Sequence, residues 1–151
     1  MSAYAEYATD FADLDCLIEA LLEMKNANGT QFTREMLEVH QDAQKMLGYQ
    51  GDVRSQKANV LIRGAGGPKK GLGANNVGGA SNDIGWEKNA DGKYVAHISE
   101  YDSGHYNETW QSKLAQTYAE KFVEKRAKRA GFKVEKEKVD GRIRMKLSRW
   151  R

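Results

Sequence analysis

The chain has 151 residues, of which 40% are hydrophobic and 30% are charged, and its formal net charge is +3. This length and composition are typical of one globular domain, so we expect residues 1–151 to form a single domain. The sequence holds no run of the roughly 20 apolar residues that cross a bilayer. Its first residues also lack the basic and apolar regions of a signal peptide. We therefore expect a protein of the cytoplasm or of a stroma-like compartment.

Charge is distributed unevenly along the chain. Residues 113–151 contain 14 Lys and Arg against 5 Asp and Glu, whereas residues 1–112 contain 10 against 16. A basic segment of this kind can mark a surface for nucleic acid or for an acidic partner. The alternative, which we favour, is a solvated helix end followed by strands whose charges pair with one another.

The residue types that carry catalysis or bind metals are too scattered to form a recognisable site. His40, His97 and His105 show no metal-ligand spacing, and no nucleophile motif accompanies them. We expect His97 to face solvent or to fill a polar niche. The single Cys16 lies in an apolar helical pattern, which predicts a buried, inert thiol. The sequence therefore favours a non-enzymatic protein without cofactor or metal, and it offers no catalytic residue.

The N-terminal segment predicts a strand followed by a helix. Residues 3–8 alternate in the manner of a short strand, and Thr9 or Asp10 can cap a helix over residues 11–24. The helical pattern turns four apolar side chains inward, namely Leu14, Leu17, Ile18 and Leu21.

Four strands are predicted in the middle of the chain. Residues 37–42 and 57–63 alternate apolar and polar side chains, and we expect each to form a half-buried strand. Residues 84–86 and 94–98 form two further runs, and the turn sequence at residues 89–92 joins them into an antiparallel hairpin.

A loop rich in glycine and lysine separates these two pairs of strands. Residues 64–79 hold seven of the 15 glycines and the only proline, and we expect a flexible loop over residues 64–82. Lys69 and Lys70, together with freed backbone amides, would suit a phosphate group. The glycine spacing nevertheless matches neither a P-loop nor a dinucleotide-binding motif, so we favour a mobile connection.

The clearest pattern predicts a long amphipathic helix over residues 110–130. Its large apolar residues recur every four positions, and small or β-branched ones widen the stripe: Trp110, Leu114, Tyr118 and Phe122, with Ala115, Ala119 and Val123. Ser103, Asn107 or Thr109 can cap the start, and Gly131 stands where a left-handed residue ends a helix.

Residues 132–139 and 142–150 are two alternating runs joined by Asp140-Gly141, a dipeptide typical of the tight turn of a β-hairpin. One register satisfies both charge pairing and apolar burial. It pairs Val139 with Arg142, Glu137 with Arg144, Glu135 with Lys146 and Val134 with Leu147.

The elements follow the order strand, helix, four strands, helix, two strands. This order predicts an α+β fold, with a single antiparallel sheet of about five to seven strands and two helices packed on one face. We expect the apolar side of the C-terminal hairpin to face the stripe of the second helix. The basic strand face and the exposed helix face then lie on opposite sides of the domain.

Several short motifs occur in an order that resembles a known family. They are Gly48-Tyr-Gln-Gly51, Ala58-Asn-Val-Leu-Ile62, Asp83-Ile-Gly-Trp86, Leu114-Ala-Gln-Thr-Tyr-Ala119, Gly131-Phe-Lys-Val134 and Asp140-Gly-Arg-Ile-Arg144, with Trp150. The chain resembles the hypothetical chloroplast open reading frame thirty-five family, an uncharacterised domain found in plastids, cyanobacteria and phages. This resemblance implies no established activity. It implies the plastid stroma or, for a phage-encoded member, the host cytoplasm as alternative locations.

Two groups of residues are candidate binding sites. Four side chains of the last strand share one face that would suit single-stranded nucleic acid: Arg142, Arg144, Lys146 and Trp150. Tyr49, Gln50 and Gly51 either bind a ligand or form a turn, which we favour, and Trp86 either packs in the core or anchors a partner.

Our leading hypothesis is a small non-catalytic accessory or adaptor domain that acts through a protein partner. The second hypothesis is a weak binder of nucleic acid or phosphate that uses the basic hairpin and the Gly/Lys loop. The third is an enzyme of unrecognised type.

Overall fold

The computed structural model describes residues 2–67 and 74–149. Its elements follow the predicted order of strand, helix, four strands, helix and two strands. They are β1 (Tyr4–Tyr7), α1 (Leu14–Leu21), β2 (Leu37–Leu47), β3 (Val53–Ile62), β4 (Ile84–Lys88), β5 (Tyr94–Ser99), α2 (Glu108–Arg129), β6 (Phe132–Val139) and β7 (Arg142–Arg149). Short 3-10 turns at Arg34–Met36 and Asp102–Gly104 precede β2 and α2.

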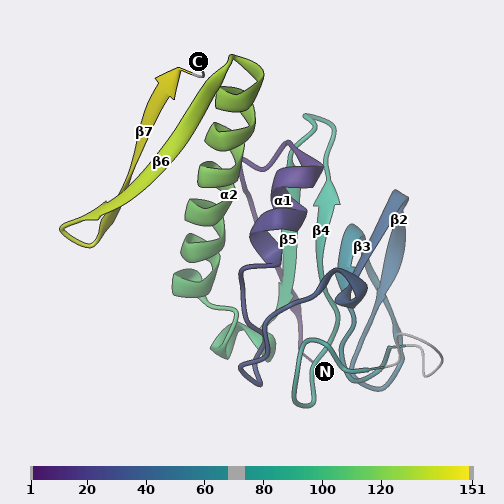
Figure 1. Cartoon of the computed structure of the whole chain (residues 1–151). Coiled ribbons are helices and arrows are strands. Elements are labelled where there is room, and N and C mark those ends of the chain that lie inside the picture. Colours follow the sequence, from purple (N-terminus) through teal and green to yellow (C-terminus); the bar gives the residue numbers. More distant parts are fainter. Residues whose placement is uncertain (1, 68–73, 150–151) are drawn as a thin grey trace.

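Five strands form one antiparallel sheet in the order β1-β5-β4-β3-β2, and both helices cover the same face of this sheet (Figure 1). Their apolar side chains meet inward residues of the strands in one core. Leu17, Leu21, Leu114, Ile84 and Trp86 are each at most 1% exposed there. The predicted α+β class, with an antiparallel sheet and two helices on one of its faces, is confirmed.

α1 begins later than predicted because its capping residue is different. The Asp13 side chain accepts the Cys16 N–H at 3.0 Å and so starts the helix at Leu14. Thr9, a predicted cap, instead donates its hydroxyl to the Tyr94 carbonyl. The segment between β1 and α1 therefore runs beside Tyr94, the first residue of β5, whose N–H donates to the Phe11 carbonyl at 2.8 Å.

α2 begins at Glu108, two residues before the predicted range, and its cap is Asn107, one of the three predicted candidates. The Asn107 side chain accepts the Trp110 N–H at 2.9 Å, which satisfies a backbone donor that the helix itself cannot satisfy. Gly131 follows the helix with a φ of +83°, the left-handed conformation expected after a helix end.

The C-terminal hairpin has the predicted register but does not join the main sheet. Val134 pairs with Leu147, and Asp140 and Gly141 both have positive φ in the tight turn. β6 and β7 form a separate two-stranded sheet beside α2, on the side away from the five-stranded sheet (Figure 1). The expectation of one continuous sheet is corrected in this respect.

The hairpin lies apart because the apolar stripe of α2 is already covered. Leu114 and Tyr118 belong to the core formed with α1 and the strands. On another side of the helix, the Lys136 ammonium lies 2.5 Å from Glu124 and 3.6 Å from Glu120. The expected contact between the helix stripe and the hairpin is therefore wrong, and ion pairs on a neighbouring side of α2 hold the hairpin instead.

β2 and β3 are longer than predicted. The end of β2 and the start of β3 reach over the face of the sheet that the helices leave uncovered. The Leu47 N–H donates to the Asp83 carboxylate at 2.8 Å, and Arg54 donates to the Ser2 carbonyl at 2.6 Å. A small second cluster of apolar side chains forms beneath this extension: Met46, Ala58, Leu61 and the partly buried Tyr4.

The glycine-rich segment is packed into the fold at its described ends. Val77 is fully buried, and its carbonyl accepts the Tyr106 hydroxyl at 2.7 Å and the Ala27 N–H at 3.1 Å. These contacts anchor a described end of the segment, and the flexibility expected over residues 64–82 stays a prediction. Lys69 and Lys70 belong to residues 68–73, which lie outside the described residues.

Candidate functional site

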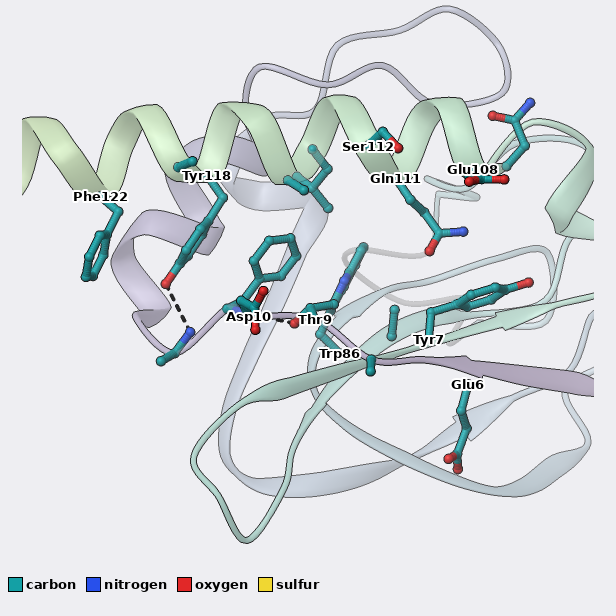
Figure 2. Close-up of a pocket in the computed structure, with 18 of the residues that line it drawn as sticks. Glu6, Tyr7, Thr9, Asp10, Trp86, Glu108, Gln111, Ser112, Tyr118 and Phe122 are labelled. Carbon is teal, nitrogen blue, oxygen red and sulfur yellow. Dashed lines mark hydrogen bonds between the residues drawn. The ribbon is translucent and has the colours of Figure 1, made fainter. Parts of the chain in front are cut away.

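A groove with a volume of about 1120 Å³ runs between α2 and the segment formed by β1 and the residues after it. Figure 2 shows α2 along one wall and Tyr7, Thr9 and Asp10 along the other. This volume exceeds the range of roughly 300–1000 Å³ typical of small-molecule sites. The groove therefore has room for an elongated ligand.

The wall formed by β1 is a free edge of the sheet. β1 pairs with β5 from Tyr4 to Tyr7, and no other described strand pairs with it. Side chains alternate along a strand, so Tyr7 faces α2 whereas Glu6 points to the opposite face of the sheet (Figure 2). The outer backbone groups of β1 thus lie beside the groove, where a further strand can pair with them.

Aromatic side chains close one end of the groove. The rings of Phe11 and Tyr118 lie 4.5 Å apart, and those of Tyr118 and Phe122 stack at 6.1 Å. The Tyr118 hydroxyl accepts the backbone N–H groups of Ala12 at 3.0 Å and of Asp13 at 2.9 Å. These bonds fix the segment between β1 and α1 against the helix.

The groove stays open where small side chains line it. Ala115 and Ala119 stand on the groove side of α2 and are both exposed. The floor is formed by buried residues of the core, among them Trp86 and Leu114. An apolar side chain of a ligand can therefore enter between the helix and the strand without displacing the core.

The charged side chains that line the groove are acidic. They are Asp10 and Glu108. Glu6 also borders the groove, but its side chain points to the opposite face of the sheet. Asp10 lies 3.4 Å from the exposed Lys93, a surface pair that contributes little. The described lining residues include no Lys, Arg, His or Cys, although Arg126 lies over the Phe122 ring at 5.6 Å. The groove lining is therefore mainly apolar and aromatic, and its charged members among the described residues are acidic.

Outside the groove, a polar cluster lies on the face of the sheet that the helices do not cover. His97 is only 2% exposed, and its Nε2 lies 2.9 Å from the Glu87 carboxylate, while its Nδ1 lies 3.9 Å from Glu6. Of the two alternatives predicted for His97, the polar niche is correct. Within residues 2–67 and 74–149, no group of three or more His, Cys, Asp and Glu is arranged to hold a metal ion.

Arg63 joins β2 to the residue that precedes β4. It donates to Glu38 at 2.6 and 3.0 Å and to the fully buried Asp83 at 2.7 Å. Burial alone raises the pKa of Glu38, but hydrogen bonds from Arg63 and His40 outweigh it and hold that pKa below its usual value. This cluster has a structural role, because it fixes the extended β2–β3 pair against the sheet.

Cys16 is 1% exposed, as predicted for an inert thiol. Burial, followed by the nearby Asp13 carboxylate, raises the pKa of Cys16 to about 11. The thiol therefore stays protonated at neutral pH, which suppresses its reactivity as a nucleophile.

The cationic residues predicted for nucleic-acid binding do not reach the groove. Arg142, Arg144 and Lys146 are exposed on the hairpin face opposite to the one that carries Lys136, and Arg144 lies 3.7 Å from Glu137. Trp150 lies outside the described residues.

Tyr49, Gln50 and Gly51 lie in the turn between β2 and β3. Gly51 has a φ of +82° and donates its N–H to the Gly48 carbonyl at 3.0 Å, which supports the turn interpretation. The Tyr49 N–H donates to the Asn82 side chain at 2.9 Å. Trp86, the fourth residue of this group, is a core residue that contributes to the floor of the groove.

The groove itself was missed from the sequence, although one signal pointed to it. Ala115, Ala119 and Val123 widen the apolar stripe of α2 beyond the width that packing on one sheet requires. Val123 is 37% exposed, so this widened part of the stripe is not used by the core. An apolar helix stripe wider than its partner surface is the pattern that indicates such a groove.

The sequence matches the family described as "Protein of unknown function (DUF1257)" over residues 34–146, about three quarters of the chain. The matched range includes α2 and Trp86, whereas β1 and α1 precede it. No curated protein and no solved structure matches the chain. Neither described helix has the length and apolar composition needed to cross a membrane. Because the match covers most of its length, the chain belongs to this family of proteins of unknown function.

Proposed function

We propose that this protein is a non-catalytic adaptor that binds an extended segment of a protein partner between β1 and α2. The observation that carries the proposal is a free strand edge beside a groove walled by a helix. A peptide can add to such an edge as a further strand. Its main-chain hydrogen bonds then supply affinity, and its alternate side chains enter the groove and supply specificity.

The two sides of the added strand would meet different chemistry. Side chains on the α2 side meet Tyr7, Ala115 and Ala119, which favours apolar residues. Side chains on the other side lie beside Glu6, which favours cations, since opposite charges on neighbouring strands contribute roughly 0.2–1 kcal/mol per pair. The preferred partner segment therefore alternates apolar and basic residues.

A labelled eight-residue peptide of alternating valine and lysine tests this proposal by fluorescence anisotropy with the full chain. Saturable binding is expected, and methylation of the peptide's backbone amides should abolish it because strand pairing needs those donors. Ala119→Arg places a bulky side chain in the groove and should weaken binding at least tenfold. Gln116→Arg, also exposed on α2 but outside the groove, is the matched control and should leave binding unchanged.

The charge preference has its own test at Glu6, which is 71% exposed in its side chain. Glu6→Lys should weaken the valine-lysine peptide and strengthen a valine-glutamate peptide of equal length. Equal affinities of wild type, Ala119→Arg and Glu6→Lys for both peptides would contradict docking in the groove.

A second candidate function is binding of nucleic acid by the cationic hairpin face. The observation in its favour is that Arg142 and Lys146 are exposed and form no ion pair with the described residues. Single-stranded oligonucleotide should then bind with an affinity that falls with salt, and Arg142→Ala should reduce the salt slope by about one unit. Salt-independent or absent binding would remove this candidate.

The proposal also includes the narrower assignment to the hypothetical chloroplast open reading frame thirty-five family, supported by the motif order from Gly48 to Trp150. It places the adaptor in an aqueous compartment, either the cytoplasm or a plastid stroma. Fractionation of cells of the native host, with detection of the protein by antibody, tests this placement, and recovery in the membrane fraction would contradict it.

A further inference from the structure

We propose that the groove also accepts β7 of a second copy of this chain, so that the protein associates with itself through unlike surfaces. This inference rests on the proposed function, because it uses the same groove and the same free edge of β1. It adds a specific occupant, argued from the chemistry of the hairpin.

β7 has the pattern that the groove favours. Its sequence, Arg142-Ile-Arg-Met-Lys-Leu-Ser-Arg149, alternates cations with apolar residues. Ile143 is 41% exposed and Leu147 is 50% exposed, both on the hairpin face that also carries Lys136. The apolar face of β7 is therefore only partly covered within its own chain.

β7 also has a free edge. It pairs with β6 alone in the described structure, and the two strands form a sheet of their own. A two-stranded hairpin is marginally stable by itself, and an open edge is a template for pairing with another strand. Adding β7 to β1 would continue the five-stranded sheet into the hairpin of the next copy.

The two surfaces are complementary in charge as well as in apolar character. With the apolar side chains of β7 directed toward α2, Arg144 and Lys146 would stand on the face of β1 that carries Glu6. The hairpin from residue 132 to residue 149 holds seven Lys and Arg against three Asp and Glu. The groove that would receive it carries the acidic side chains of Asp10 and Glu108, Glu6 stands on the other face of β1, and no described residue that lines the groove is basic.

Two other arrangements are disfavoured by the same structure. Within one copy, α2 separates the two surfaces: Ala115 and Ala119 flank the groove, whereas Glu120 and Glu124 hold Lys136 of the hairpin on another side. Pairing of β7 with β7 of another copy would place cations beside cations, which is destabilising. The groove of a second copy avoids both difficulties, because α2 does not separate it from β7 and its charged side chains are acidic.

Contacts between unlike surfaces either close into a ring or continue as a chain of copies. In sedimentation velocity, the average mass of the full-length protein should therefore exceed the mass of one chain and should increase with protein concentration. Leu147→Glu, which places an acid on the docking face of β7, should weaken association at least tenfold. Val53→Glu is the matched control, since Val53 is 67% exposed on β3, outside both the groove and the hairpin, and its replacement should leave association unchanged.

Mixing variants distinguishes unlike from like contacts. Ala119→Arg blocks the groove but keeps the hairpin, and Leu147→Glu blocks the hairpin but keeps the groove. Each should be a single chain alone, and an equimolar mixture should regain association because it contains one intact surface of each kind. A mixture that stays at one chain, or association that neither variant weakens, overturns the inference.

The peptide assay separates this inference from the proposed function. If the valine-lysine peptide binds in the groove while wild-type protein remains a single chain at every concentration, self-association is refuted and the adaptor proposal stands. If neither the peptide nor a second copy binds, both are refuted. Docking of β7 further predicts that a synthetic peptide of residues 142–149 competes with the valine-lysine peptide, and lack of competition counts against it.

Discussion

Tyr118 ties α2 to the segment before α1, and its hydroxyl can be removed without removing its ring. Tyr118→Phe deletes the acceptor of the Ala12 and Asp13 N–H groups, at 3.0 and 2.9 Å. The ring is 7% exposed and would keep its contacts with Phe11 and Phe122. Each lost hydrogen bond costs about 0.5–1.5 kcal/mol, so the free energy of unfolding should fall by about 1–3 kcal/mol. For a chain of this size, each kcal/mol lost from the free energy of unfolding lowers the midpoint of thermal unfolding by roughly 2–4 °C.

Urea unfolding at 25 °C measures this loss directly. Tyr101→Phe is the control, since Tyr101 is 57% exposed and its hydroxyl makes no hydrogen bond with the described residues. The control should stay within about 0.5 kcal/mol of wild type, as surface substitutions do. Amide exchange at Ala12 and Asp13 should also accelerate in Tyr118→Phe. Equal stabilities of the two variants would refute the view that this hydroxyl anchors the wall of the groove.

Three further predictions concern the packing and ion pairs of the fold. Gly85→Ala should cost roughly 1–3 kcal/mol in urea unfolding, because its added carbon would lie 2.4 Å from the Ala58 methyl, whereas Gly104→Ala, with open space around it, should cost little. Val77→Ala should cost about 2 kcal/mol by the same measurement if the glycine-rich segment is packed as its burial indicates. The folded-state pKa of Glu38 lies below its ordinary value of 4.5, so its ion pair stabilises the fold fully above that pH and is lost as pH falls through the folded pKa. Glu38→Gln should therefore flatten the loss of stability below pH 4.5.

Features encoded by local patterns were predicted well from the sequence. The register of the last hairpin follows from alternation and from the turn at Asp140 and Gly141, which involve only neighbouring residues. The start of α2 follows from Asn107, and the residue after its end from Gly131. In each case the determining interaction lies within a few residues along the chain.

Features that depend on distant contacts were missed. α1 starts after the Asp13 cap, and the N–H groups of Ala12 and Asp13 just before it bond to Tyr118, which is more than one hundred residues away in sequence. β2 continues to Leu47 because Asp83 receives its backbone N–H, although the residues from 41 to 45 show no apolar alternation. Val77 packs in the core because Tyr106 and Ala27 bond to its carbonyl. None of these partners is visible in a local pattern.

The error in predicting a single sheet and the presence of an open groove have the same physical cause. Alternation determines which residues pair within a hairpin, but it does not determine which strand edge the hairpin joins. If β6 and β7 extended the sheet at β1, their apolar face would lie under α2 and would fill the groove. Instead, Lys136 bonds to Glu124 on another side of α2, and the hairpin forms a two-stranded sheet of its own. The free edge of β1 and the exposed apolar face at Leu147 are the two surfaces that the proposed self-association would bring together, and the proposed partner strand would occupy the first of them.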